Sequence, residues 1–277
     1  MSAPGSTPSS IADTFASATL WIVDLDGVVW LTGEPIGDAP EAIAALRSRG
    51  VRVVFATNNS APTTDELLGR LDRMGVNSSP ADLVTSAGAV ASLLQPGESV
   101  KVMAEGGVLE ALAARGVRTD DDDRAVAAVV GWSRSFDFDS LAATASVARS
   151  TGRLLATNED PTHPTPAGLV PGSGALLAAV ATASGVAPVI AGKPHQPMAS
   201  LMRTAFGFED GDPSVVVIGD QPGTDGRLAE RLTVPFGLVD SGVTPATAGG
   251  FDVPIALRFP DFGTLVRSVL ALSLIHI

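Results

Sequence analysis

The sequence has no cysteine and no tyrosine, and it contains few aromatic residues and few cations. Without cysteine, the chain cannot form disulfides, thiolate nucleophiles or zinc–thiolate sites. Aromatic residues make up only 5% of the chain, so the core must consist mainly of alanine, valine, leucine and isoleucine. Lys and Arg number 18 against 30 Asp and Glu, a net charge of −12, whereas nucleic-acid backbones and anionic membrane surfaces require a basic face. We therefore expect neither nucleic acid nor a membrane as a partner.

The sequence also has no apolar run long enough to cross a membrane. A transmembrane helix needs about 20 apolar residues, and the uncharged stretch 161–192 is interrupted by Pro171, Gly172, Gly174, Gly185 and Pro188. The first fifteen residues have neither the basic start nor the apolar block of a secretory signal. We expect a short flexible leader there, and a soluble, cytoplasmic protein.

Short apolar, β-rich runs alternate with helical patterns along most of the 277 residues, which predicts βαβ units on a largely parallel sheet. An apolar share of 45% is ample for a buried core. We expect strands at about residues 20–24, 51–57, 83–85, 99–103, 125–131, 153–157, 187–190, 214–219 and 234–239. We expect helices at about residues 39–49, 64–74, 108–115, 140–150, 197–206 and 224–232, and an alanine-rich helix that follows the strand at 83–85 and ends before Pro96.

Two aspartates follow the first of these strands. Asp24 and Asp26 stand at its carboxyl end, and Gly27 lets the chain turn after them. In open α/β sheets, ligands bind outside the carboxyl ends of the strands. A turn with both carboxylates in solvent is the alternative interpretation.

The second strand ends in the small polar residues Thr57, Asn58, Asn59 and Ser60. Hydroxyl and amide groups at a strand end can donate hydrogen bonds to phosphate oxygens without adding charge. Since asparagine and serine also favour turns, a simple turn is the alternative.

Acidic residues also follow the strand at 214–219. Asp220 comes directly after it, and Asp225 stands near a helix start, where it could instead be a helix cap. In a doubly wound sheet, Asp24, Asp26, Asp220 and Asp225 would converge. Unit charges about 4 Å apart repel by roughly 1 kcal/mol in water and about 4 kcal/mol near a protein surface. Because hard carboxylate oxygens without histidine or cysteine select Mg²⁺, the cluster predicts a magnesium site.

A single lysine ends a further apolar segment. Lys193 lies in the sequence IAGKPHQPM, where it could neutralise a phosphate, although a surface lysine is the alternative. Gly172 and Gly174 precede a helix, as glycines do in phosphate-binding loops. Because the lysine of such a loop is missing there, close packing is the better explanation.

Four short motifs occur in order along the chain: DLDGVV from Asp24, TNNS from Thr57, GKP from Gly192 and GDQPGTD from Gly219. Together they resemble the four motifs of the haloacid dehalogenase (HAD) superfamily. The pattern is similar to that of its class IIA phosphatases, which include nitrophenylphosphatases and phosphoglycolate or glycerol-phosphate phosphatases. The similarity extends from about Leu20 to Leu265.

The resemblance implies an α/β fold with a doubly wound, parallel-sheet, Rossmann-like core over residues 1–96 and 190–277. An inserted α/β cap domain would occupy residues 97–189. This insertion would explain why far more chain than one crossover requires separates Ser60 from Lys193. Members of the group often pair through the cap, so a homodimer is a further implication.

The resemblance also implies how the phosphoryl group is transferred. Asp24 would be the nucleophile that takes up the phosphoryl group as an aspartyl phosphate. Asp26 would be the general acid toward the leaving alcohol and then the general base for the water. The residues that would hold the transferring phosphate are Thr57, Asn58, Asn59 and Lys193. A carboxylate nucleophile divides one slow hydrolysis into two steps, which agrees with these roles.

The implied metal site uses the same aspartates. Mg²⁺ would be held by the carboxylates of Asp24 and Asp220 and by the backbone carbonyl of Asp26, with Asp225 in support. Phosphoryl transfer requires neutralisation of charge by metal and cations, which the set would supply.

The inserted segment contains candidates for contact with the leaving group. Residues 154–180 resemble the substrate-facing loop of the cap, and within them Asn158, Asp160 and His163 could reach the substrate. A histidine can contact phosphate or hydroxyl groups, and the alternative is a His163 bonded locally. The chain has Ser133 after Gly131 and Trp132, where many members have aspartate, which leaves the leaving-group specificity open.

From these residues we expect a Mg²⁺-dependent phosphatase that hydrolyses small phosphorylated metabolites, such as glycerol phosphate or phosphoglycolate. A broad-specificity nitrophenylphosphatase is the first alternative. A catalytically silent phosphate-binding or regulatory protein on the same fold is the second. The presence of Asp24, Asp26, Lys193 and Asp220 argues against it, because a silent relative could lose Asp24 freely.

Overall fold

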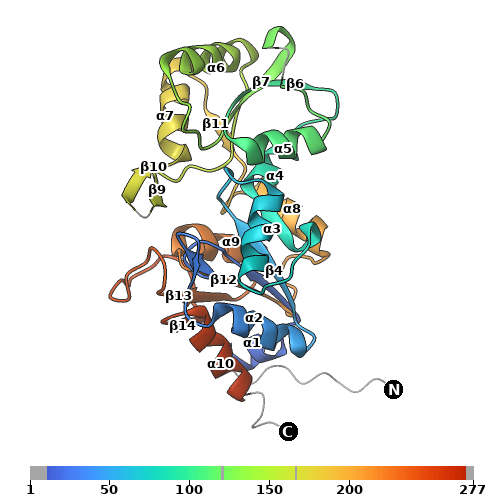
Figure 1. Cartoon of the computed structure of the whole chain (residues 1–277), viewed down its shortest axis with the longest axis vertical. Coiled ribbons are helices and arrows are strands. Elements are labelled where there is room, and N and C mark those ends of the chain that lie inside the picture. The colour runs from blue at the N-terminus through green and yellow to red at the C-terminus, as the bar shows by residue number, and fades with distance from the viewer. Residues whose placement is uncertain (1–10, 120–121, 166, 273–277) are drawn as a thin grey trace. The chain divides into compact units, whose positions relative to one another are not determined.

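The computed structural model describes residues 11–119, 122–165 and 167–272 (Figure 1). Its contacts divide the chain into two compact units. The first holds the described parts of Met1–Phe55, Met74–Val76 and Phe208–Ile277, and the second holds those of Ala56–Arg73 and Asn77–Gly207. These bounds differ from the expected domains of 1–96 with 190–277 and of 97–189. The division into a catalytic core and an inserted cap stays a prediction.

The first unit is built on parallel strands in the order β14–β13–β12–β1–β4. Their bounds are Leu20–Val23 for β1, Arg52–Thr57 for β4, Val215–Gly219 for β12, Phe236–Val239 for β13 and Leu257–Phe259 for β14. In the register, Val23 of β1 pairs with Ile218 on one side and Phe55 on the other. Strands that follow β1 in the sequence therefore lie on both sides of it in the sheet, and β1 is the point where the strand order reverses. Ligands bind beside such switch points in doubly wound sheets, and the expected fold class is confirmed.

The central strands of this unit are buried along their whole length. Every residue of β1, β12 and β13 is buried, as expected for parallel strands covered on both faces. The helices of the unit are α1 (Ile11–Ser17), α2 (Ala39–Ser48), α9 (Arg227–Leu232) and α10 (Phe262–Leu272), and a short ribbon joins β2 (Trp30–Leu31) to β3 (Glu34–Pro35).

The flexible leader expected over the first fifteen residues is wrong for residues 11–15. These residues belong to α1, whose Phe15 is buried and meets the ring of Trp21 edge-on at 6.0 Å. Trp21 meets Phe262 of α10 in the same way at 6.3 Å. Edge-to-face aromatic packing of this kind holds the segment in place. Residues 1–10 lie outside the described part of the chain.

The second unit contains a parallel four-stranded sheet in the order β11–β8–β7–β6. The strands of this sheet are β6 (Ser99–Met103), β7 (Ala125–Val130), β8 (Leu154–Ala156) and β11 (Pro188–Ile190). Outside this sheet, the unit also holds β5 (Leu83–Thr85) and an antiparallel hairpin of β9 (Thr162–Thr165) and β10 (Gly168–Pro171). Its α-helices are α3 (Thr64–Arg73), α4 (Ser86–Ala91), α5 (Gly106–Ala114), α6 (Phe138–Thr151), α7 (Ser173–Ser184) and α8 (Gln196–Phe206), and 3₁₀ turns lie at Pro80–Asp82 and Asp122–Arg124.

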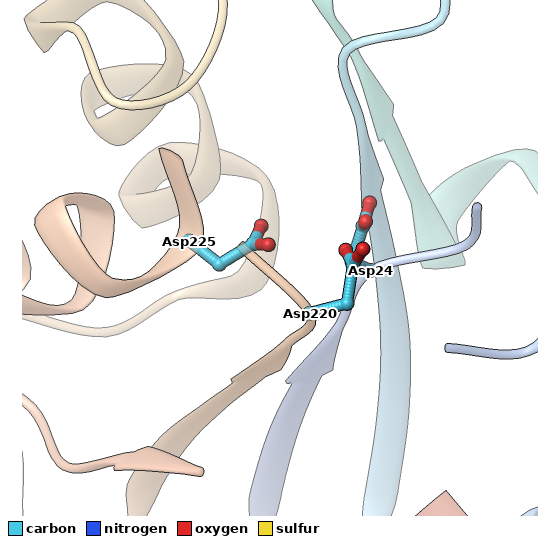
Figure 2. A group of neighbouring side chains, drawn as sticks. All are labelled: Asp24, Asp220 and Asp225. Atoms are coloured by element: carbon cyan, nitrogen blue, oxygen red, sulfur yellow. The ribbon is translucent and has the colours of Figure 1, made fainter. Parts of the chain in front are cut away.

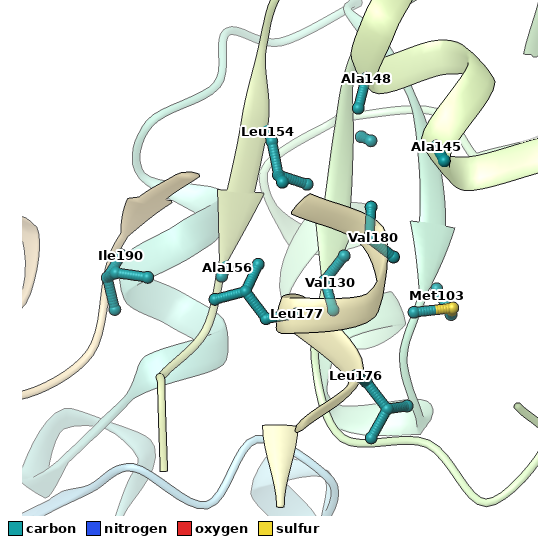
Figure 3. Close-up of a cluster of buried hydrophobic side chains, with 11 residues drawn as sticks. Met103, Val130, Ala145, Ala148, Leu154, Ala156, Leu176, Leu177, Val180 and Ile190 are labelled. Carbon is teal, nitrogen blue, oxygen red and sulfur yellow. The ribbon is translucent and has the colours of Figure 1, made fainter. Parts of the chain in front are cut away.

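Helices α6 and α7 pack on this sheet through small and branched apolar side chains. Figure 3 shows Ala145 and Ala148 of α6 and Val180 of α7 beside Val130 of β7 and Leu154 of β8. Asp137 caps the start of helix α6, and its carboxylate accepts a hydrogen bond from the amide of Ser140 at 2.7 Å. This bond lowers the pKa of Asp137.

The two glycines before α7 allow a close backbone approach. A Cβ at Gly172 would lie 2.2 Å from the carbonyl oxygen of Asp160, and one at Gly174 would lie 2.2 Å from that of Glu159. Packing of α7 against the preceding loop therefore explains both residues. In the described ranges, no helix is both long enough and apolar enough to span a membrane.

Candidate active site

Three buried carboxylates gather where two neighbouring strands of the first unit end. Asp24 follows β1, Asp220 follows β12, and Asp225 lies in the turn after β12. One carboxylate oxygen of each residue lies within 4.8 Å of the others (Figure 2), and the exposed fractions are 7%, 0% and 1%. Because β1 and β12 are parallel neighbours, their carboxyl ends meet at one edge of the sheet.

The chemistry of this group suits a hard divalent cation. Carboxylates so close together repel one another, and burial strengthens the repulsion because water no longer screens it. Protons or a cation must compensate for the charge. The donors are all oxygen atoms, with no histidine in the group, which matches the preference of Mg²⁺.

The fourth aspartate does not join this group. The carboxylate of Asp26 accepts a hydrogen bond from the indole Nε1 of Trp30 at 2.9 Å. Strand β1 already ends at Val23, and Gly27 turns the chain with φ of +89°. The alternation of a continuing strand therefore does not apply to Asp24 and Asp26. The expected convergence of four carboxylates is wrong for the Asp26 side chain.

Asp225 is oriented by an unusual turn. Residues Pro222–Gly226 form a short π-helix ahead of α9, where an ordinary helix from 224 was expected. The amide of Asp225 donates to Gln221 O at 2.8 Å, and the amide of Gln221 donates to Asp225 Oδ2 at 3.2 Å. A Cβ at Gly219 would lie 2.2 Å from Asp225 Cγ, so only glycine leaves room for this carboxylate. The glycine directly before Asp220 is the sequence signal for this contact.

The segment after β13 also contacts the site, which was not expected from the sequence. The amide of Val243 donates to Asp220 Oδ2 at 2.6 Å, and the hydroxyl of Ser241 donates to Gly27 O at 2.7 Å. A Cβ at Gly242 would lie 2.0 Å from Asp220 Oδ2. In the sequence, the signal for this contact is the pair Ser241-Gly242, which lies just after β13, the strand beside β12.

In the second unit, the side chain of Asn58 holds the backbone of Lys193. The Lys193 amide donates to Asn58 Oδ1 at 2.7 Å, and Asn58 Nδ2 donates to Lys193 O at 3.1 Å. Lys193 is only 3% exposed, and its Nζ donates to Ala56 O at 3.0 Å. The surface-lysine interpretation is therefore wrong. The side-chain amide of Asn58 is bound to the Lys193 backbone, and its expected contact with the phosphate stays a prediction.

Thr57 and Asn59 make local turn contacts. The amide of Asn59 donates to Thr57 Oγ1 at 3.0 Å, and the amide of Ala61 donates to Asn59 Oδ1 at 3.3 Å. The Asn58 carbonyl accepts hydrogen bonds from Ser86 Oγ at 2.7 Å and from Asn158 Nδ2 at 2.8 Å. This turn is thus tied to helix α4 and to the loop after β8.

The loop after β8 also contacts the Asn58 side chain. Asn58 Nδ2 donates to Asp160 Oδ2 at 3.3 Å. His163 lies in β9 with its ring 5.5 Å from the ring of Trp132, and Trp132 Nε1 donates to Pro171 O at 2.9 Å. The structure gives His163 a local packing contact, and its role at the leaving group stays a prediction.

Comparison with known proteins identifies relatives that match most of the chain. A family model described as haloacid dehalogenase-like hydrolase matches residues 21–118, and one described as HAD-hydrolase-like matches residues 190–262. A D-glycerol 3-phosphate phosphatase of Mycobacterium tuberculosis is 35% identical over 240 residues, which cover 84% of this chain and 66% of that protein. An acid sugar phosphatase of Staphylococcus saprophyticus is 31% identical over 254 residues, which cover 90% of this chain and 97% of that protein.

Solved structures of similar fold include phosphatases. A glycerol phosphate phosphatase from M. tuberculosis, crystallised in complex with magnesium, has 31% identity and a TM-score of 0.82, covering 94% of this chain and 78% of that one. A p-nitrophenyl phosphatase from Archaeoglobus fulgidus has 26% identity and a TM-score of 0.85, covering 91% of this chain and 99% of that one.

Proposed function

Because the chain belongs to the class IIA phosphatases of the haloacid dehalogenase superfamily, and is therefore a phosphoric monoester hydrolase, we propose that it is a Mg²⁺-dependent enzyme acting on small phosphorylated metabolites. The observation that carries the proposal is the group of Asp24, Asp220 and Asp225 at the ends of β1 and β12. Glycerol phosphate is our first candidate substrate, because the relative with 35% identity is a D-glycerol 3-phosphate phosphatase.

The residues that would hold Mg²⁺ are the carboxylates of Asp24 and Asp220 and the backbone carbonyl of Asp26. Asp225 would support the site through its own negative charge. When bound, the ion would neutralise charge on the aspartates and on the phosphate oxygens. Three buried acids that lie within 4.8 Å of one another support this assignment.

The chemical steps would use Asp24 and Asp26. A carboxylate oxygen of Asp24 attacks phosphorus, the bond from phosphorus to the alcohol oxygen breaks, and Asp26 gives that oxygen a proton. A water molecule then attacks the phosphorus of the aspartyl phosphate and gives its proton to Asp26. The bond to Asp24 breaks, and inorganic phosphate leaves. The hydrogen bond from Trp30 Nε1 would keep the Asp26 carboxylate in one orientation during both steps.

The phosphate would be bound by groups at the end of β4 and by Lys193. Thr57 stands two residues after Phe55, the sheet partner of Val23, and Asp24 follows Val23 directly. Thr57 and Asn59 would donate to phosphate oxygens, and the ammonium group of Lys193 would balance their charge. We assign Asn58 the task of positioning Lys193, because both polar groups of its amide are bound to the Lys193 backbone.

Removal of divalent metal tests the proposed cofactor. We expect dialysis against EDTA to abolish hydrolysis of p-nitrophenyl phosphate, and added Mg²⁺ to restore it. Mg²⁺ at a hundred times its Kd should also stabilise the folded protein by about 2.7 kcal/mol, because it binds the folded state alone. Full turnover in EDTA, with no rise in Tm on adding Mg²⁺, would reject the metal site.

Substitution of Asn58 tests how the lysine is held. Asn58→Ala removes two hydrogen bonds to Lys193, each with a net value of about 0.5–1.5 kcal/mol, so we expect affinity for inorganic phosphate to fall about 5- to 100-fold. Asn58→Asp retains the acceptor for the Lys193 amide, but it places a carboxylate oxygen against the Lys193 carbonyl and the Asp160 carboxylate, so it should lose at least as much affinity. Isothermal titration calorimetry with phosphate in the presence of Mg²⁺ measures both variants.

A double-mutant cycle separates this role from direct contact with phosphate. If Asn58 acts through Lys193, the effect of Asn58→Ala should largely disappear when Lys193 is already replaced by methionine. Additive losses from the two substitutions would instead show that Asn58 touches the phosphate itself.

A substrate panel tests the substrate class. We expect glycerol phosphate or another small phosphorylated metabolite to give the highest kcat/KM among glycerol phosphate, phosphoglycolate, sugar phosphates and p-nitrophenyl phosphate. Similar values for all four would favour the broad-specificity alternative. Pairing of two copies through residues 97–189 and a cytoplasmic location stay predictions.

A further inference from the structure

The segment Asp240–Val243, here called the β13 loop, reaches both parts of the chain that would hold the metal. The amide of Val243 donates to Asp220 Oδ2 at 2.6 Å. The hydroxyl of Ser241 donates to the carbonyl of Gly27, the residue after Asp26, at 2.7 Å. One loop of four residues therefore touches the end of β12 and the turn that follows β1.

Close packing leaves no space between these parts. A Cβ at Gly27 would lie 2.7 Å from Asp220 Oδ2 and 3.0 Å from the Cα of Gly242. A Cβ at Gly242 would lie 2.0 Å from the same carboxylate oxygen. The Asp220 carboxylate is thus held between two glycine backbones, and the Val243 amide fixes its rotation. The hydrogen bond from the Ser241 hydroxyl joins the Gly27 turn to the β13 loop, and these two backbone segments enclose the Asp220 carboxylate.

The β13 loop is itself anchored from the next strand. Arg258 of β14 pairs with Asp240, with its Nε 2.9 Å from Asp240 Oδ1. Its terminal nitrogens donate to the carbonyls that follow the loop, at Pro245, Ala246 and Ala248. The guanidinium also lies 5.7 Å from the ring centroid of Phe251. This set of contacts holds the loop without using any residue of the carboxylate group.

We propose that Ser241 is a positioning residue for the metal site: its hydroxyl holds the Gly27 turn against the β13 loop, so that Asp220 and the backbone of Asp26 face the same cation. The inference rests on the proposed function. Groups that orient metal ligands typically change metal affinity about 10- to 100-fold when they are removed. Ser241 would act through its hydrogen bond to the Gly27 carbonyl, and through that turn on Asp220.

The test measures Mg²⁺ binding to the substrate-free protein by isothermal titration calorimetry. We expect Ser241→Ala to raise the Kd for Mg²⁺ about tenfold, while Ser241→Thr, which keeps the hydroxyl, restores most of the affinity. Ser214→Ala is the matched control, because its hydroxyl also bonds within the first unit, to Asp212 at 2.7 Å, away from the carboxylates. In turnover, Ser241→Ala should be impaired at limiting Mg²⁺ and should approach the wild-type kcat at saturating Mg²⁺.

Unchanged Mg²⁺ affinity in Ser241→Ala would overturn the inference, as would a Ser241→Thr variant as weak as the alanine variant. An equal loss in Ser214→Ala would also overturn it, because a general loosening of the unit would then explain the effect. A wild-type protein that binds no Mg²⁺ would contradict the proposed function itself. These outcomes keep the failure of the inference distinct from that of the proposed function.

Discussion

Asp24→Asn removes the nucleophile and is expected to lower hydrolysis of p-nitrophenyl phosphate at least a thousandfold. The amide has nearly the same shape as the carboxylate, but its oxygen carries no charge with which to attack phosphorus. Loss of a covalent nucleophile typically has an effect of this size or larger. The measurement is kcat at saturating substrate and Mg²⁺, with circular dichroism to verify that the variant is folded.

The control for this variant is Asp72→Asn on the exposed face of α3, which changes the net charge by the same amount and should leave turnover unchanged. Substantial hydrolysis by Asp24→Asn would reject the aspartyl-phosphate mechanism. An activity that depended on Mg²⁺ but not on Asp24 would point to direct attack by water.

Gly219→Ala is expected to have the largest effect on stability. Its Cβ would lie 2.2 Å from Cγ of Asp225, inside a strand whose residues are all buried. Either the Asp225 carboxylate must leave its place or the strand must shift, and overpacking of this kind costs about 1–3 kcal/mol. We therefore expect Tm to fall by about 2–12 °C. The gain in Tm on adding Mg²⁺ should also shrink, because Asp225 no longer supports the site.

Gly223→Ala is the matched control for this substitution. Gly223 lies four residues further along, and a Cβ there would meet no atom within 4 Å. The control should leave both Tm and the response to Mg²⁺ near the wild-type values. A fully stable Gly219→Ala protein with normal Mg²⁺ binding would contradict the packing of Asp225 against this glycine.

The position of the carboxylates could be predicted from the sequence because it follows from local patterns. Apolar runs located β1 and β12, and parallel neighbours must end at the same edge of a sheet, which brings Asp24 and Asp220 together. The direction of each side chain was harder to predict. Asp26 departed from the expectation because β1 ends at Val23, so the alternation of the strand does not reach Asp26, whose carboxylate accepts a hydrogen bond from Trp30 Nε1.

Contacts between distant segments could not be predicted in this way. Asn58 and Lys193 are separated by 135 residues, and no periodicity indicates that an amide at one position will bind the backbone at the other. The same holds for Ser241 and Gly27, which are 214 residues apart. Helix α1 was missed because its few apolar residues, such as Phe15, gain their stability by packing on Trp21. In each case, the missing information was the tertiary partner.

The hydrogen bonds of Asn58 tie down the base of the loop after β8, whereas the hairpin beyond the base packs on Trp132 instead. Asn158 and Asp160, at the base, both bond to Asn58, which in turn holds Lys193. The hairpin of β9 and β10 makes none of these bonds. Under the proposed function, changes in the hairpin would alter which alcohol is accepted, while the contacts by which Asn58 positions Lys193 would stay the same. In a phosphatase built in this way, the preferred alcohol and the binding of the phosphate would be set by separate segments of the chain.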